Sequence, residues 1–267
     1  MNRALLAHTW RANRLRVAIV TVALLVWGTL MPVVFDAFGT QFQDLFDSGT
    51  FPAQFAQFGG GDIFSLTGAV ALGFVHPIAV GLNLVFALGF ATAAVAGERQ
   101  RGTLEVLLSR PLSRRGVYAT LALAGALFIA ISVAGLALGS LLGATITGRT
   151  AELGVANLPL LWLNGVLLYW AFGSIGLLAS VSFDRLSPAL SLTLAFVLIS
   201  YFLDVLGSLW PDAKWLQPIS LFHYVDPKSV LAGFPNRGDF AFLALVTAVA
   251  AAAALVVFPR RDLAAPS

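Results

Sequence analysis

Six long apolar segments alternate with shorter polar stretches along the chain. They cover about residues 17–35, 72–96, 117–147, 158–182, 187–209 and 240–258. An α-helix needs roughly 20 apolar residues to cross the hydrocarbon core of a bilayer, and the third segment is long enough to tilt or to project from it. The pattern predicts an all-α integral membrane protein with six transmembrane helices, forming a single domain over residues 1–267.

Three of the polar stretches also carry apolar side chains and are predicted to lie at the membrane surface. Residues 1–16 combine four arginines with a thin stripe of Leu6, Trp10 and Val17, which favours an interfacial helix before the first span. Phenylalanines recur through residues 36–65 up to Gly59–Gly61, so amphipathic pieces are expected there. Residues 210–238 are rich in aromatic residues and proline, which is typical of a structured interfacial segment.

The basic residues are distributed unequally between the two sides of a six-span protein. The termini and the loops 97–115 and 183–186 share one side, which holds twelve of the fourteen arginines. The other side holds four basic residues: Arg149, Lys214, Lys228 and Arg237. Because loops rich in lysine and arginine stay in the cytoplasm, both termini and the 97–115 loop are predicted to be cytoplasmic.

The composition agrees with a membrane protein and excludes several kinds of site. Hydrophobic residues make up 58% of the chain and charged residues only 11%, whereas soluble domains have about 25% charged residues. The absence of cysteine excludes disulfides, thiolate metal sites and a cysteine nucleophile. The net charge of +3 does not indicate nucleic-acid binding, because the membrane topology accounts for the positions of the arginines.

Two features inside the spans bear on how the helices pack. His76-Pro77 lies near the start of the second span, where it either kinks a helix or opens one. Gly135, Gly139 and Gly143 are spaced by four residues and form a smooth ridge for the close approach of another helix. The sequence leaves open whether that helix belongs to the same chain.

The densest run of charge is residues 97–115, which also contain a short helical pattern. Leu104, Leu107 and Leu108 are spaced to share one helix face. Thr103 can cap the start of this helix, Pro111 prevents its continuation, and Ser113 can cap the next helix. A helix this short is marginal alone, so its apolar face requires a cover. Chemistry alone leaves two alternatives: another protein, or a loop whose leucines rest on the membrane.

Groups that could power transport or carry out catalysis are scarce. A phosphate-binding loop needs glycines followed by lysine, but Gly59–Gly61 precede an aspartate, and neither lysine follows a glycine. Asp204 is the only charged residue within a span and lies close enough to the outer boundary for a structural role. The alternative function is a self-sufficient channel or proton-coupled carrier that uses Asp204. A metal site formed by His76 and His223 is less favoured than local roles for both.

Three sequence motifs resemble those of one membrane protein family. GERQRGTLEVLLSRPLSR, beginning at Gly97, resembles the first cytoplasmic loop of permease subunits of type-2 ATP-binding-cassette exporters. PISLFHYVDP at residues 218–227 resembles their segment before the last span, and FPRRDL at residues 258–263 resembles their final exit. The resemblance extends over the whole chain, except that Leu221 stands where the family commonly has proline.

The resemblance implies a coupling helix at about Thr103 to Arg110 that docks on a separate ATPase subunit. Two permeases and two ATPases would form the transporter in a prokaryotic plasma membrane. ATP and Mg²⁺ would bind only to the ATPase, so this chain would bind no cofactor and would not itself be an enzyme. Residues 1–16 would be an interfacial elbow, and residues 210–235 would include re-entrant helices. The implied ATPase-coupling residues are Glu98, Arg101, Gly102, Thr103, Leu104, Glu105, Leu107 and Leu108.

Overall fold

A computed structural model describes residues 2–49, 64–109 and 112–261 of the chain. These residues form helices and no strand. Six stretches are long and apolar enough to cross a membrane, which confirms the predicted all-α fold with six membrane helices. The main helices are α1 (Arg3–Asp47), α2 (Leu66–Val75), α3 (Pro77–Thr92), α4 (Glu98–Gln100), α5 (Thr103–Leu108), α6 (Arg114–Ile146), α7 (Leu158–Ser182), α8 (Leu186–Leu209), α9 (Pro227–Leu231) and α10 (Arg237–Arg260).

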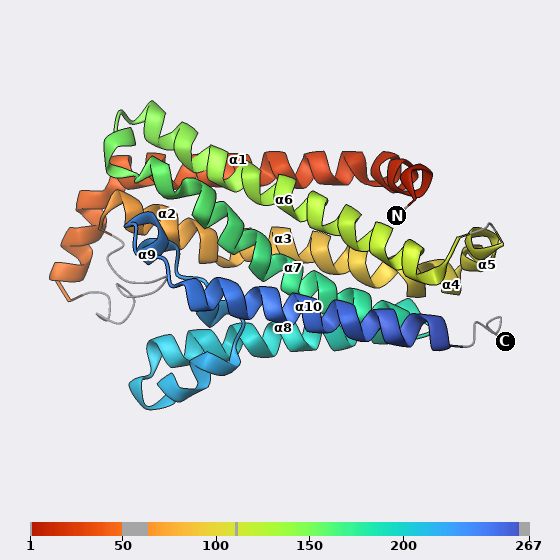
Figure 1. Ribbon diagram of the computed structural model, residues 1–267. Helices are drawn as coiled ribbons and strands as arrows, with labels where there is room; N and C mark the ends of the chain where they lie inside the picture. Colours follow the sequence, from red (N-terminus) through yellow and green to blue (C-terminus); the bar gives the residue numbers. More distant parts are fainter. Residues whose placement is uncertain (1, 50–63, 110–111, 262–267) are drawn as a thin grey trace.

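The long helices form a bundle around α7 (Figure 1). The span that contains α7 is the most buried, and α7 packs against α3, α6, α8 and α10. The spans formed by α1, α8 and α10 are the least buried, so their apolar side chains cover the outside of the bundle. Such a surface suits contact with lipid or with another membrane helix.

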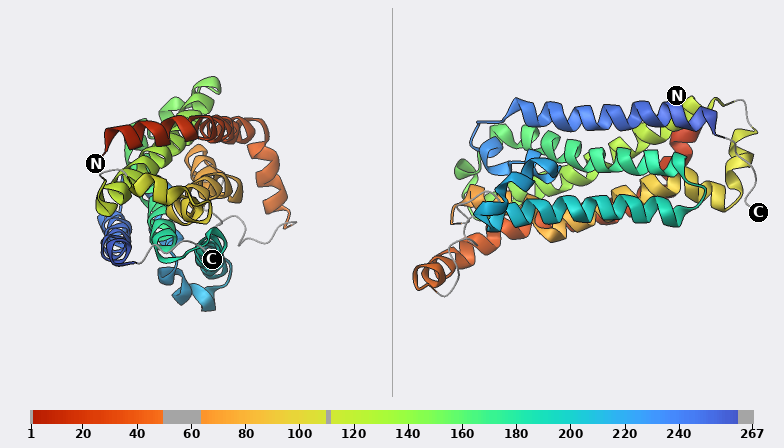
Figure 2. Two further views of the ribbon diagram at one scale, coloured as in Figure 1. Left: turned by 90° about the vertical axis from the view of Figure 1, so that its right-hand side faces the viewer. Right: turned by 90° about the horizontal axis from the view of Figure 1, so that it is seen from below.

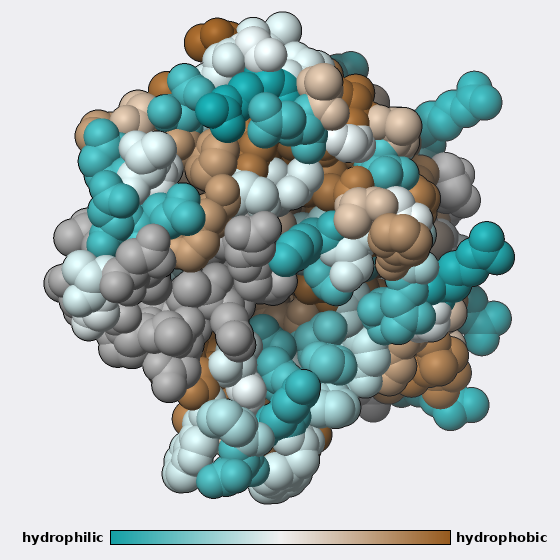
Figure 3. All heavy atoms as spheres, turned by 90° about the vertical axis from the view of Figure 1, so that its left-hand side faces the viewer, coloured by the Kyte–Doolittle hydropathy of each residue, from teal (hydrophilic) through white to brown (hydrophobic). Residues whose placement is uncertain are grey.

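The two ends of the bundle differ in what they carry. One end of the bundle, called here the arginine-rich end, carries the start of α1, the end of α10, α4, α5 and the connection between α7 and α8 (Figures 1 and 2). The far end carries α9 and the start of α2. Hydrophilic residues gather on the face of this far end, with apolar side chains among them (Figure 3). The loops predicted to share one side of the membrane therefore do lie together.

Helix α1 is longer than the sequence predicted. Residues 1–16 were expected to form a helix separate from the first span, but α1 continues from Arg3 to Asp47. The reason is that no proline or glycine interrupts residues 3–27. The helix bends instead, so that its first part runs across the arginine-rich end (Figure 2, left). The amphipathic pieces expected after Phe35 are partly the end of α1, and residues 50–63, with Gly59–Gly61, lie outside the described residues.

The glycine ridge of α6 packs against α1 of the same chain, which answers the question left open by the sequence. A Cβ atom added at Gly135 would lie 2.6 Å from the carbonyl oxygen of Thr21, and one at Gly143 would lie 2.5 Å from that of Thr29. A Cβ atom at Gly139 would overlap the carbonyl oxygen of Leu25. The two helix backbones therefore approach so closely that no side chain fits between them.

The second span is divided at His76. Helix α2 ends at Val75 and α3 begins at Pro77, so His76-Pro77 opens a new helix. The Nδ1 atom of His76 accepts a hydrogen bond of 3.3 Å from the backbone N–H of Ile78 and so caps α3. The span begins at Leu66, earlier than predicted, because the short helix α2 precedes the break.

Residues 210–238 form a structured segment at the far end of the bundle. A 3₁₀-helix, η5 (Pro211–Ile219), packs on α8 and is followed by η6 (Phe222–Tyr224) and α9. The hydroxyl of Ser200 on α8 lies 3.1 Å from that of Ser220 and accepts a hydrogen bond from the backbone N–H of Leu221. These buried bonds hold the segment on the bundle, whereas its depth in a membrane stays a prediction.

We expect Gly139→Ala to destabilise the bundle even though alanine favours helices. The added methyl group meets the backbone of α1, which cannot move without separating the two helices, and overpacking of this kind costs about 1–3 kcal/mol. Thermal unfolding of the purified protein in detergent measures the effect. Gly89→Ala on α3 is the matched control because its Cβ atom has no neighbour within 4 Å. Equal melting temperatures for the two variants would contradict the close packing.

Candidate functional site

The short helix predicted between the second and third spans exists and lies at the outer limit of the arginine-rich end (Figure 1). It is α5, and residues 110–111 after it lie beyond the described part of the chain. Gly102 precedes it with φ +72°, a left-handed conformation that glycine adopts readily. Thr103 does not cap the helix as predicted, since the N-cap residue is Gly102, which has no side chain. The chain instead turns sharply at Gly102.

Glu98 fixes the approach to α5. Its Oε2 atom accepts a hydrogen bond of 2.5 Å from the hydroxyl of Thr103, and its Oε1 atom forms a salt bridge with Arg101. The same hydroxyl lies 3.1 Å from the backbone oxygen of Glu98. One carboxylate therefore holds both sides of the Gly102 turn, which sets the direction in which α5 leaves the bundle.

Leu104 does not belong to an uncovered face, which corrects the prediction for this residue. Its side chain is 2% exposed and belongs to a buried cluster of this chain. The cluster joins six α-helices (α1, α3, α5, α6, α7 and α10) and includes Leu5, Val117, Tyr118, Leu177 and Phe258. The physical reason is that the turn at Gly102 folds α5 back, so its first leucine reaches the bundle core.

The other predicted coupling residues have different positions. Arg101, Gly102, Thr103 and Glu105 are exposed around the start of α5. Leu107 and Leu108 lie on the α5 backbone, but their side chains are outside the described part of the structure. The predicted coupling residues whose side chains are described therefore form a polar surface, with Leu104 as the one apolar side chain buried beneath it.

The helix that leads to α5 contains a π-helical turn, η2 (Ala93–Gly97). Such a turn widens the backbone and breaks the regular hydrogen-bond ladder. Ser180 on α7 compensates, because its hydroxyl accepts bonds from the N–H groups of Val95 at 3.0 Å and Ala96 at 2.9 Å. The same hydroxyl donates to the carbonyl oxygen of Thr92 at 2.7 Å. A single side chain thus ties this irregular turn to the central helix.

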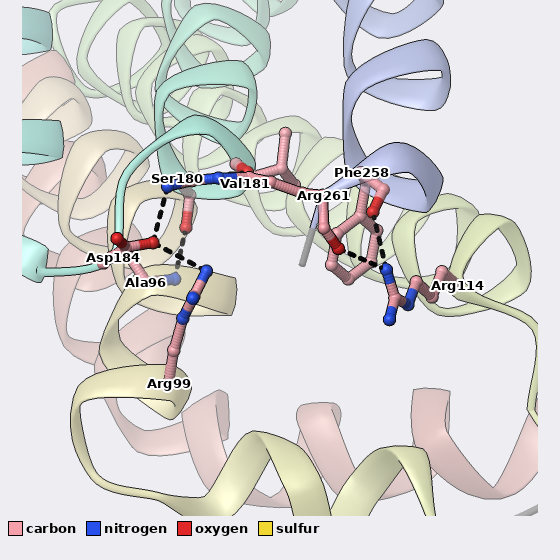
Figure 4. Close-up of polar contacts among 8 residues, drawn as sticks. All are labelled: Ala96, Arg99, Arg114, Ser180, Val181, Asp184, Phe258 and Arg261. Atoms are coloured by element: carbon pink, nitrogen blue, oxygen red, sulfur yellow. Dashed lines mark hydrogen bonds and ion pairs between the residues drawn. The ribbon is translucent and has the colours of Figure 1, made fainter. Parts of the chain in front are cut away.

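A network of charged groups surrounds this turn (Figure 4). Asp184, in the connection between α7 and α8, lies between two arginines. Its Oδ1 atom is 2.6 Å from Arg99, whose side chain is largely buried, and 2.5 Å from Arg261 after α10. Arg114 at the start of α6 donates to three carbonyl oxygens at the end of α10, at 2.7–3.3 Å. The Arg114 contacts place a cation at the C-terminus of α10, where the backbone dipole favours it.

Comparison with known families agrees with this architecture. The family model described as ABC-2 family transporter protein matches residues 9–263, which is nearly the whole chain. The chain belongs to this family. No curated protein matches it. The protein is therefore a multi-pass membrane component of an ATP-binding-cassette transporter, a permease subunit, and the resemblance seen in the three motifs is confirmed.

Sequence reasoning missed much of the arginine-rich end of the permease. Ser180, Arg99, Asp184 and Arg261 were not assigned roles. Their partners lie about 80 residues away in sequence, and the π-helical turn has no pattern that marks it. One signal was present: Asp184 is the only acidic residue in its loop, on a side rich in arginine.

Among the described residues, Asp204 forms no salt bridge. Asp204 lies near the end of α8, beside the turn into η5, and its backbone oxygen accepts a hydrogen bond from Ser208. Within the described residues, no group of three histidine, aspartate or glutamate side chains could hold a metal ion. His76 has the local capping role that was preferred for it.

Ser180→Ala should destabilise the permease by about 1–3 kcal/mol, because two buried N–H groups lose their acceptor. Amide hydrogen exchange should also become faster in residues 93–97. Mass spectrometry of exchange, together with thermal unfolding in detergent, measures both effects. Ser182→Ala is the control, since that hydroxyl bonds only to Leu178 of its own helix among the contacts found. Unchanged exchange in Ser180→Ala would show that the turn does not depend on this hydroxyl.

Glu98→Ala should loosen α5 and leave the bundle intact. Exposed ion pairs contribute only about 0–1 kcal/mol, so the melting temperature should change little. Exchange at residues 101–105 should rise several-fold, because both contacts that the Glu98 carboxylate makes across the Gly102 turn are lost. Glu105→Ala serves as the control for removing an acidic residue in this segment. A similar rise in both variants would assign the effect to charge and not to the Glu98 contacts.

Proposed function

We propose that this permease is driven by a separate ATPase subunit that docks on α5 and exports a hydrophobic or amphipathic substrate. One observation carries the proposal: α5 lies at the outer limit of the bundle, yet Leu104 anchors it in a buried cluster shared with five other α-helices. A partner that moves α5 would therefore displace the bundle and not a free loop. Family membership supports the presence of such an ATPase.

The contacts suggest how a push on α5 would travel. Arg101, Gly102, Thr103 and Glu105 offer the partner a polar surface, and Glu98 fixes its direction. Behind this surface, Leu104 transmits force to α6, α7 and α10 through the buried cluster. The same motion reaches α3 through η2, the π-helical turn that Ser180 ties to α7.

The distribution of arginines supports a cytoplasmic position for the arginine-rich end, and with it both termini, in a prokaryotic plasma membrane. An ATPase docked there would have access to cytoplasmic ATP and Mg²⁺, both of which it would bind itself. This chain would supply no nucleotide site, since its glycine-rich stretch has no following lysine.

A second permease copy would complete the transporter. Large apolar side chains are exposed along α1, α8 and α10, which offers surface for helix-to-helix contact as well as for lipid. The substrate would pass between the second and fifth spans of each copy, as the family resemblance implies. A path between such apolar helices favours a hydrophobic or amphipathic substrate. Asp204 as the switch of a self-sufficient carrier is the weaker alternative, because Asp204 forms no salt bridge with another described residue.

A charge reversal on α5 tests the docking site. Glu105 is exposed, so Glu105→Lys should preserve the fold. It should reduce ATPase binding several-fold, because the new lysine would either repel a positive charge of the ATPase or have no acidic partner on it. Tagged permease is purified from the cells that naturally make it, and ATP hydrolysis and co-purified subunits are measured. Asp212→Lys on η5 is the matched control, with the same charge change at the far end of the bundle.

The two variants separate the docking site from the function. Loss of ATP hydrolysis with Glu105→Lys alone supports docking on α5. Full activity with Glu105→Lys would exclude this surface, and the absence of any ATPase from wild-type preparations would contradict the proposed function. Substituting Leu104 would not serve this purpose, because it would disrupt the core of the permease itself.

A further inference from the structure

A groove opens between the first part of α1 and the middle of α6, away from the α5 surface. Its volume is about 350 Å³, within the range of about 300–1,000 Å³ found for small-molecule sites. Most of its lining is apolar, and two arginines from α1 complete it. The residues that line it are Arg3, Leu6, Ala7, Trp10, Arg11, Ala124, Leu127 and Phe128.

The walls of the groove are fixed on both sides. Beyond Arg3, the backbone N–H of Asn2 donates a hydrogen bond of 3.0 Å to the hydroxyl of Thr120 on α6. On the other side, α1 meets the α6 glycines from Thr21 onward. Between these points the floor is made by Ala124 and Phe128, both buried within the protein. The groove is thus part of the fold and not a gap between loose segments.

The two arginines of the groove have no acidic partner among the described residues. Within the described residues, neither Arg3 nor Arg11 forms a salt bridge, and both are exposed. Arg3, Leu6, Ala7 and Trp10 share one face of α1, since they are spaced by three or four residues. The ring of Trp10 lies 5.7 Å from that of Phe128. Positive charge and an apolar wall therefore occupy the same side of the helix.

The length of α6 indicates that the groove lies near the depth where a bilayer changes from headgroups to hydrocarbon. Helix α6 has 33 residues and is about 50 Å long, whereas the hydrocarbon core is about 30 Å thick. Counting roughly 20 residues back from Ile146, the far end of α6, reaches the neighbourhood of Leu127. Trp10 is also of a type that gathers at this boundary. A ligand in the groove would thus have one end in each environment.

We propose that this groove binds one anionic phospholipid, with its phosphate on Arg3 and Arg11 and an acyl chain against Leu127 and Phe128. Two unpaired cations beside an apolar wall match the charge and polarity of such a lipid, and arginine binds phosphate oxygens with charge-assisted hydrogen bonds. The lipid fills the space between α1 and α6 and holds the first part of α1 against the bundle. This site is independent of the ATPase contact at α5.

Native mass spectrometry of the purified permease in detergent, titrated with phosphatidylglycerol or phosphatidylcholine, tests the site. The wild type should bind one phosphatidylglycerol at least tenfold more tightly than phosphatidylcholine. Arg3→Ala with Arg11→Ala should weaken phosphatidylglycerol binding about tenfold, since each arginine near the headgroup contributes to attraction. Arg115→Ala with Arg185→Ala removes two exposed arginines of the same end that do not line the groove. This control should change the affinity for phosphatidylglycerol less than twofold.

A second variant tests the acyl chain separately from the charge. Ala7→Trp fills the groove from its exposed side and leaves both arginines in place, so it should also weaken binding about tenfold. Thermal unfolding shows which variants remain folded. A binding measurement on either folded groove variant, the Arg3 and Arg11 double variant or Ala7→Trp, is sufficient to test the site.

Several results would overturn the proposal. Unchanged binding in the Arg3 and Arg11 double variant would exclude the arginines as the phosphate site. Equal weakening in the Arg115 and Arg185 control would show that diffuse positive charge attracts the lipid. Unchanged binding in Ala7→Trp, or displacement of the lipid by excess inorganic phosphate, would reduce the site to one for a free anion. Equal affinity for phosphatidylcholine would remove the role of charge altogether.

Discussion

The close approach of α1 and α6 is the contact on which the rest of the bundle depends. Inside a bilayer no hydrophobic effect drives helices together, so they must gain dispersion energy by bringing their backbones close. The ridge of Gly135, Gly139 and Gly143 makes this possible along several turns. Because α6 also packs on α7, the outer helix α1 becomes part of the same rigid unit. The groove at Trp10 and the cluster at Leu104 both lie where these helices separate towards the arginine-rich end.

At the arginine-rich end, polar contacts hold the helices together instead of glycine packing. Asp184 joins Arg99 and Arg261, which brings together the ends of α4, α7 and α10. The hydroxyl of Ser180 accepts hydrogen bonds from two buried N–H groups of the irregular turn before α5, and without it these groups would lack acceptors. A short helix that is unstable alone is therefore held in a defined direction. This arrangement suits a surface that must receive force from a partner without folding away.

The sequence predicted the six spans, the short helix between the second and third, and the cap at Ser113, whose hydroxyl accepts a bond from Gly116. These features depend on local composition and spacing, which a single chain displays directly. The sequence did not show that residues 1–16 continue into the first span as one bent helix, because a polar stretch rich in arginine resembles a separate helix even when nothing in it stops helical hydrogen bonding. It also failed for Leu104, because a helical face does not reveal which neighbour covers it.

Hydrophobic segment length and the placement of arginines by themselves determined the fold class and the grouping of loops, since the bilayer imposes a fixed thickness and a charge preference on any chain. The glycine spacing showed that a helix would pack closely but not which one. Only the tertiary structure decided that this helix is α1, that Leu104 anchors α5 from within, and that Arg3 and Arg11 border an apolar groove. Each of these facts joins residues distant in sequence, and their contact energies exist only once the helices are packed.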